Sequence, residues 1–174
     1  MGAYGRLFIR FFPMEISEKE IIAAQQQWGQ GIVAIGEAFV HHEDYRAKAN
    51  SLVHELYAYG DGPVLFKPTK AAACPFRRTE AEAISYFVQG VIEEDRGFAI
   101  QPWAQVRFEN ADIALHGDSA LAMGNYYFTD RDSGEEVRVE YNFGYHKDDQ
   151  GAVRINLHHS SMPYHAEDAA VTAS

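Results

Sequence analysis

A change of hydrophobic period near residue 98 limits the possible folds more than any other feature of the chain. Before it, apolar residues recur at helical spacing, and after it they alternate with polar residues. Period-two alternation predicts strands with one buried face. It runs through four segments, WAQVRFENADIALHG, SALAMGNYYFTD, EEVRVEYNFGYH and AVRINLHHSS. RDSG and DDQG, which connect the last three, suit tight hairpin turns, so we predict an antiparallel meander.

The part of the chain before these strands predicts helices. Apolar spacing indicates one helix over about residues 18–41, a second over about 44–58 and a third from Thr79 to near Gly90. The first and third begin with capping boxes, formed by Ser17 with Glu20 and by Thr79 with Glu82. GDGPVLFKP predicts a turn and a short strand that Pro68 ends. Helices followed by a meander define an α+β protein, with N-terminal helices packed on a curved antiparallel sheet.

Length and composition indicate one globular domain. The chain has 174 residues, of which 47% are hydrophobic and 13% aromatic, enough to bury a stable core. We expect one domain over residues 16–164, with an N-terminal arm at 1–15 and a C-terminal tail at 165–174. The single cysteine, Cys74, excludes an intrachain disulfide and a multi-cysteine zinc site.

Charge and hydropathy exclude two kinds of partner. A net charge of −10 leaves no basic surface for phosphates, so nucleic acid is not an expected partner. No stretch reaches the ~18 apolar residues of a membrane span. RLFIRFF is broken by Arg10 and lacks a small-residue cleavage site, so it makes a poor signal peptide. We expect a soluble protein, cytoplasmic by default, or periplasmic or plastid if a targeting segment was removed.

The last strand ends in two histidines and two serines, and strand alternation predicts which of them face the core. Alternate side chains of a strand point to opposite faces. In AVRINLHHSS one set is apolar until its last members, and it comprises Val153, Ile155, Leu157, His159 and Ser161. We therefore expect His159 and Ser161 to face inward and His158 and Ser160 to face outward. His159 is explained equally well as a core histidine with a hydrogen-bonded partner.

Aromatic residues on the neighbouring strand suggest a small enclosed pocket. The inward set of EEVRVEYNFGYH is Val137, Val139, Tyr141, Phe143 and Tyr145. A concave sheet with such a lining, closed by a helix, would enclose a ligand-sized space. Four other aromatics, Trp28, Trp103, Phe108 and Tyr126, are expected in the core rather than in a site. Lys67 and Lys70 fit solvated loop lysines better than attractors of an anion.

Seven stretches in order resemble one known family. They are LFKPTKA, SYFVQG, EDRGFAI, PWAQVRFEN, AMGNYYFT, VEYNFGY and RINLHHSSMPY. Together they resemble the iota class of carbonic anhydrases, which is related to the association domain of calcium/calmodulin-dependent kinase II. The resemblance covers about residues 16–164. It implies a cone of helix and curved antiparallel sheet, the cystatin-like or SnoaL-like fold, which pairs as a homodimer.

The resemblance also implies a reaction, the reversible hydration of carbon dioxide to bicarbonate. In the family, hydroxyl side chains from three motifs form the substrate pocket. Here they fall on Thr69 in KPTKA, Tyr86 in SYFVQG and Ser161 in HHSS, with His159 as a pocket neighbour. The strand-face argument selects the same serine. Tyr86 lies about 200° around its helix from Ile84, beside small residues that would let another layer approach.

A conventional zinc site is not expected. The chain has eight histidines but no HxH, HExxH or CxxC arrangement, and catalytic zinc needs three protein ligands. The resemblance implies either no cofactor or, in some members, manganese. Without metal, hydroxyls would position water and carbon dioxide and stabilise the anion. His159 would be the proton shuttle by residue type.

Two other functions remain open, and each has its own mark in the sequence. A non-catalytic association module of the same fold would not need Thr69, Tyr86 and Ser161 together. A SnoaL-like small-molecule isomerase usually needs a carboxylate inside the cone, and the assigned inward positions hold none. For the implied homodimer, we expect the interface near the outward set of the last strand, which comprises Arg154, Asn156 and His158.

Overall fold

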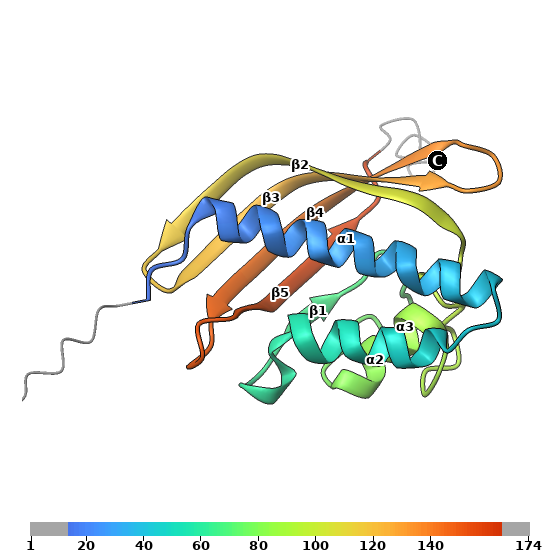
Figure 1. Ribbon diagram of the computed structural model, residues 1–174, viewed down its shortest axis with the longest axis horizontal. Coiled ribbons are helices and arrows are strands. Elements are labelled where there is room, and N and C mark those ends of the chain that lie inside the picture. The colour runs from blue at the N-terminus through green and yellow to red at the C-terminus, as the bar shows by residue number, and fades with distance from the viewer. Residues whose placement is uncertain (1–13, 165–174) are drawn as a thin grey trace, which may run out of the picture.

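The computed structural model describes residues 14–164 as three α-helices, a short 3-10 helix and five strands (Figure 1). Nearly all of the expected arm at 1–15 and the expected tail at 165–174 lie outside the described residues. The helices are α1 (Glu18–Val40), α2 (Tyr45–Leu56), η1 (Ala58–Gly60) and α3 (Glu80–Val88). The strands are β1 (Leu65–Lys67), β2 (Trp103–His116), β3 (Ser119–Asp130), β4 (Glu136–Lys147) and β5 (Val153–Ser161). Between residues 14 and 164 there is no helix of the length and apolarity that a membrane span requires.

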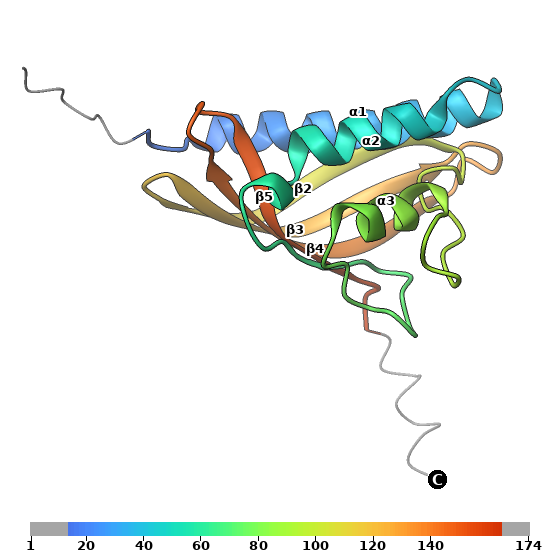
Figure 2. The same ribbon diagram turned by 90° about the horizontal axis from the view of Figure 1, so that it is seen from below.

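The five strands form one curved sheet in the order β1-β5-β4-β3-β2. Strands β2 to β5 pair antiparallel with their neighbours, as the predicted meander requires. The helices lie on the concave side of the sheet, with α1 running along it and α2 and α3 beside β5 and β1 (Figures 1 and 2). The predicted α+β class and the curved sheet with N-terminal helices are confirmed.

The edge strand β1 differs from the expected all-antiparallel sheet. It pairs in parallel with β5, and Phe66 lies opposite His158 in this register. A parallel pair needs a long connection between its strands, and here the connection contains α3, β2, β3 and β4. The consequence for the site is that the loop after β1 starts beside the C-terminal end of β5.

Local sequence signals set the helix starts and turns as predicted. Ser17 with Glu20 and Thr79 with Glu82 form complete capping boxes at the starts of α1 and α3. The two predicted hairpin turns contain Gly134 and Gly151, whose φ values are 71° and 83°. Glycine adopts this left-handed conformation without the steric cost that a Cβ imposes.

Trp28 of α1 is the centre of the core. It is 1% exposed, and its ring lies within 6.3 Å, centroid to centroid, of six other rings, those of Phe87, Phe108, Tyr126, Phe128, Phe143 and His158. The expectation that Trp28, Trp103 and Tyr126 are core residues is confirmed, and Phe108 packs against the same core while partly exposed.

Candidate active site

A β-bulge in β5 reverses the expected direction of its last five side chains, Leu157 to Ser161. Gly144 of β4 pairs with Leu157 and Tyr145 pairs with Ile155, so Asn156 has no partner. An extra residue in one strand moves every later side chain to the other face. The expected inward direction of His159 and Ser161 is therefore wrong. His158 and Ser160 face inward instead, opposite Phe143 and Tyr141, and are 2% and 3% exposed.

The two displaced candidates lie away from the core. His159 is exposed and lies opposite Asn142 of β4 and Lys67 of β1. Ser161 is half-buried and lies opposite Glu140. Because Glu140 is an exposed residue, this position belongs to the outer face of the sheet. The structure thus does not bring Ser161 or His159 together with Thr69 and Tyr86.

Thr69 and Ser160 make the central contact of the candidate site. Thr69 lies in the loop just after β1, and its Oγ1 is 2.8 Å from Ser160 Oγ at the end of β5. The parallel pairing of β1 with β5 brings these two positions together. Thr69 is half-buried, so the pair lies between the core and the surface.

Tyr86 approaches the same pair from α3. Its side chain is 5% exposed, and its hydroxyl accepts a hydrogen bond of 3.4 Å from the backbone N–H of Lys70. Burial raises the pKa of Tyr86, while its polar contacts with the Lys70 N–H and with Thr69 oppose this rise. The tyrosine therefore stays protonated at neutral pH and remains able to donate. Two of the three predicted hydroxyls, Thr69 and Tyr86, are brought together, and Ser160 takes the place expected for Ser161.

Tyr126 of β3 adds a fourth hydroxyl, on a residue that was expected only in the core. It is 2% exposed. Burial raises the pKa of Tyr126, and the nearby hydroxyls of Ser160 and Thr69 work against that rise. We call the side-chain hydroxyls of Thr69, Tyr86, Tyr126 and Ser160 the hydroxyl cluster. Tyr126 alternates inward like its neighbours, so strand pattern predicts its burial but not its polar contacts.

His158 packs directly behind the hydroxyl cluster. Its ring is stacked between Phe66 and Phe143, with centroid distances of 4.5 and 4.1 Å. Its Nδ1 is 2.8 Å from the Tyr57 hydroxyl and its Nε2 is 3.3 Å from the Tyr126 hydroxyl. Burial lowers the pKa of His158 to about 3. The imidazole is therefore neutral at physiological pH, which removes the protonated form that a shuttle would need.

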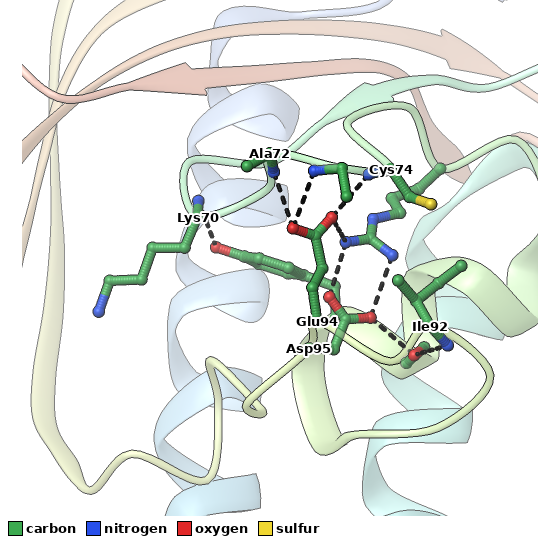
Figure 3. A network of polar contacts seen from close by, with 10 residues as sticks. Lys70, Ala72, Cys74, Ile92, Glu94 and Asp95 are labelled. Carbon is green, nitrogen blue, oxygen red and sulfur yellow. Dashed lines mark hydrogen bonds and ion pairs between the residues drawn. The ribbon is translucent and has the colours of Figure 1, made fainter.

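Glu94 holds the loop that carries Thr69 and Lys70. Its carboxylate accepts three backbone hydrogen bonds of 2.7–3.0 Å, from Ala72, Ala73 and Cys74 (Figure 3). These bonds keep the pKa of Glu94 below its ordinary value. A carboxylate that bridges three consecutive amides fixes the loop in one conformation.

A buried ion pair between Arg77 and Asp95 contacts both Glu94 and α3 (Figure 3). Arg77 is fully buried, and its guanidinium donates two hydrogen bonds to Asp95, of 3.0 and 2.6 Å. Asp95 also accepts from the Ser85 hydroxyl at 2.6 Å. The guanidinium lies over the Tyr86 ring, 5.8 Å from its centroid. Asp95 is thus fully engaged, and it is not the free carboxylate that an isomerase would need.

An open cleft of about 500 Å³ borders the hydroxyl cluster at Tyr86. Lys70, Phe98, Ile100 and Gln101 are among its other lining residues. The Lys70 ammonium is exposed and donates to Gln101 at 3.3 Å, as expected for a solvated loop lysine. The cleft gives small molecules a route from solvent to the face of Tyr86.

The described residues do not provide a metal site of the usual kind. No group of three or more His, Cys, Asp or Glu side chains between residues 14 and 164 is arranged to hold an ion. The polar groups that converge at the site are hydroxyls, which suit hydrogen bonding to an anion better than metal coordination.

Comparison with solved structures first defines the fold. An NTF-2-like protein from Shewanella oneidensis MR-1 superposes with a TM-score of 0.52 at 14% sequence identity, covering 82% of this chain and 97% of the other. A structure described as an iota-carbonic anhydrase from a cyanobacterium complexed with bicarbonate superposes with a TM-score of 0.84 at 40% identity. That match covers 87% of this chain and 95% of the other. The chain therefore has the curved-sheet fold of the NTF2-like proteins.

Sequence comparison then defines the family. The family model of metal-independent carbonic anhydrases matches residues 19–162. A metal-independent carbonic anhydrase from Nostoc sp. (strain PCC 7120) is 42% identical over 154 residues, which covers 86% of this chain and 75% of the relative. The chain belongs to the metal-independent carbonic anhydrase family. This confirms the predicted family and enzyme class, and it favours the expectation of no cofactor over the manganese alternative.

Proposed function

We propose that the chain hydrates carbon dioxide reversibly at the hydroxyl cluster, with Thr69, Tyr86 and Ser160 as the groups that contact substrate. The observation that carries this proposal is the 2.8 Å contact between Thr69 and Ser160, to which α3 adds Tyr86. Three elements distant in sequence supply these hydroxyls. The bicarbonate in the solved cyanobacterial relative supports the same ligand for this chain.

Hydroxyls suit this reaction because each one both accepts and donates. Attack of water on carbon dioxide forms one C–O bond and releases one proton, and negative charge develops on the oxygens of bicarbonate. Thr69 can accept a hydrogen bond from the attacking water, and Ser160, which accepts from Thr69, can donate to a product oxygen. Preorganised donors aimed at developing charge usually supply a large part of such catalysis.

The released proton needs an acceptor other than the expected one. His159 is exposed on the outer side of the sheet, and buried His158, with its pKa near 3, binds no proton at neutral pH. We propose that the proton passes to water or buffer in the cleft beside Tyr86. In this scheme His158 binds no proton during the reaction.

We also propose that the chain pairs as a homodimer through the outer face of the sheet. The expected set of Arg154, Asn156 and His158 does not form one exposed surface, because His158 is buried and Asn156 lies at the bulge. An apolar row instead crosses all five strands in register, and it comprises Leu65, Leu157, Gly144, Leu121 and Ala114. Light scattering of Leu121→Lys, with Asp149→Lys as control, tests this interface: a monomer is expected for the first alone.

Stopped-flow carbon dioxide hydration by the purified protein, with and without a strong chelator, tests the proposed reaction. We expect activity that survives the chelator. Ser160→Ala should then lower turnover by about 10²–10³, the usual effect of losing one preorganised donor. Ser161→Ala is the matched control and should leave the rate unchanged, because it removes an oxygen on the outer face.

Three results would count against this assignment. Equal activity of the two folded serine variants would show that Ser160 is not in the substrate pocket. Activity that appears only with added manganese would overturn the metal-free route. A folded wild-type protein without any hydration activity would favour the association module.

A further inference from the structure

A continuous hydrogen-bonded path joins the centre of the core to the hydroxyl cluster. The Trp28 indole Nε1–H lies 2.9 Å from the Tyr57 hydroxyl. That hydroxyl is 2.8 Å from His158 Nδ1, and His158 Nε2 is 3.3 Å from the Tyr126 hydroxyl. All four side chains are at most 2% exposed, so water does not compete for these bonds. The path draws on α1, the segment after α2, β5 and β3.

The first residue of this path gives it a direction. An indole N–H can only donate, so the Tyr57 oxygen is the acceptor of the Trp28 bond. The Tyr57 proton then has His158 Nδ1 as its acceptor, and a buried hydroxyl proton is rarely left without one. Nδ1 is therefore unprotonated, and the proton of the neutral imidazole resides on Nε2. This tautomer is assigned from the bonding pattern of the neighbouring groups.

The fixed tautomer changes what Tyr126 can do. His158 Nε2–H donates to the Tyr126 oxygen, so Tyr126 keeps its own proton for Ser160 and Thr69, with which it interacts. In the opposite tautomer Tyr126 would donate to Nε2, and the hydroxyl cluster would lose one donor. With the Nε2–H tautomer, the Tyr126 proton is available to the Thr69–Ser160 pair, in which Thr69 donates to Ser160, so the Ser160 proton is left for a bound anion.

The surroundings of His158 hold the ring in place for this task. Phe66 and Phe143 stack on its two faces with interplanar angles of 11° and 20°. Both ring nitrogens are taken by tyrosine hydroxyls, so rotation of the ring would break two buried hydrogen bonds. The low pKa of His158, near 3, agrees with a ring that stays neutral while the enzyme works.

We propose that Trp28, Tyr57 and His158 are positioning residues, which impose the Nε2–H tautomer on His158 and so make the hydroxyl cluster a net donor to bicarbonate and to the anion that develops during hydration. The directions of the bonds from Trp28 to Tyr126 stand on geometry alone. Its effect on turnover rests on the proposed function. The three residues act through Tyr126, and none of them touches the substrate.

Nitrogen-15 NMR of the whole protein tests the tautomer without reference to activity. The two nitrogens of a neutral imidazole differ widely in chemical shift according to which one carries the proton. We expect the spectrum of wild-type protein to show an unprotonated Nδ1 and a protonated Nε2 for His158, identified by the signals that His158→Gln removes. Protonation at Nδ1, or a charged ring at pH 7, would overturn the proposal even if the enzyme is active.

Matched variants test the effect on turnover. Tyr57→Phe should lower kcat by about 10–100-fold, the scale on which outer partners affect a functional histidine, with little change in KM. The loss should be the same factor at every pH. Tyr145→Phe removes another buried hydroxyl from the same core without contacting His158, and it should leave kcat near the wild-type value. Equal rates for wild type and Tyr57→Phe would overturn the positioning role.

Replacement of His158 separates positioning from proton transfer. A glutamine amide accepts through oxygen and donates through nitrogen, so His158→Gln should stay within about 10-fold of wild type. His158→Leu offers neither group and should lose about 10²–10³. Glutamine cannot exchange a proton at this pH, so equal losses in two folded variants would assign His158 to proton transfer. If His158→Leu does not fold, Tyr57→Phe and the tautomer measurement still decide.

Discussion

The side chain of Asn156 in β5 occupies the space that a side chain at Gly144 of β4 would need. Asn156 has no partner on β4, and a Cβ at Gly144 would lie 2.7 Å from Asn156 Oδ1 and 2.8 Å from Leu157 Cβ. Real side chains essentially never approach so closely, so the bulge depends on the absence of a side chain at position 144. Through the bulge, Gly144 decides that His158 and Ser160 face the core.

Gly144→Ala should therefore disturb the site from the opposite strand. Leu157 Cβ is fixed to the backbone and cannot rotate away, so β5 must shift to admit the methyl group. We expect the free energy of unfolding to fall by about 1–3 kcal/mol, as for other overpacked positions, together with a loss of hydration activity. Urea denaturation and stopped-flow assays of the same preparation measure the two effects.

Gly60→Ala is the control for this substitution. A Cβ at Gly60 would meet no atom within 4 Å, and the position has no positive φ. Its stability should stay within about 0.5 kcal/mol of wild type. If Gly144→Ala behaves like Gly60→Ala in both measurements, the bulge does not depend on Gly144.

Most of the fold follows from periodicity and capping. Strand alternation predicts β2, β3, β4 and β5, and the two capping boxes predict the starts of α1 and α3. The parallel position of β1 was not predicted, because pairing partners are set by tertiary contacts rather than by local pattern. The same limit applies to Tyr126, whose burial was predicted while its contact with the hydroxyl cluster was not.

Only two of the four site residues selected from the sequence, Thr69 and Tyr86, lie together in the structure. Thr69 and Tyr86 were selected by family motifs, and the structure brings them together. Ser161 and His159 were selected by the family motif together with strict alternation, and a single bulge invalidates the alternation. The signal for the bulge is present in NFGYH, since a glycine inside a strand often marks a bulge or a close backbone approach. The donor and acceptor of each hydrogen bond between Trp28 and Tyr126 follow from the three-dimensional arrangement of these side chains, and no pattern in the sequence reveals them.

Buried His158 should make the protein less stable in mild acid. The folded pKa is about 3, and the unfolded value is about 6.5. Between these two pH values the unfolded state binds a proton that the folded state excludes, so acid favours unfolding. The stabilisation is complete above pH 6.5 and is lost at about 1 kcal/mol per pH unit as the pH falls toward 3.

Comparison with His158→Gln isolates this contribution from the carboxylates that titrate in the same range. Urea denaturation between pH 7 and 5 should show wild type losing stability relative to this variant by about 1 kcal/mol for each pH unit. His159→Gln, at the exposed neighbouring position, should keep the wild-type slope. Parallel slopes for wild type and His158→Gln would contradict a neutral buried imidazole.

Glu94→Gln should loosen the loop that carries Thr69. An amide has one acceptor oxygen and no charge, so it cannot hold the N–H groups of Ala72, Ala73 and Cys74 as the carboxylate does. We expect faster hydrogen exchange at these three amides and a reduced hydration rate. Glu93→Gln, at an exposed position next to it, is the control. Unchanged exchange in Glu94→Gln would show that the loop is held by other contacts.

The ion pair of Arg77 with Asp95 should matter more for stability than any other polar contact described above. Both side chains are fully buried, and Arg77 Nε has no acceptor among the described residues, so the guanidinium depends on its carboxylate partners. Asp95→Asn removes the hydrogen-bonded one, leaves only Glu94 at 3.9 Å, and should cost about 3–5 kcal/mol. The double variant Arg77→Met/Asp95→Leu removes both charges and should be more stable than Asp95→Asn. Urea denaturation at pH 7 measures the stability of both variants. A double variant less stable than the single one would show that the ion pair adds net stability and does more than offset the cost of burying its two charges.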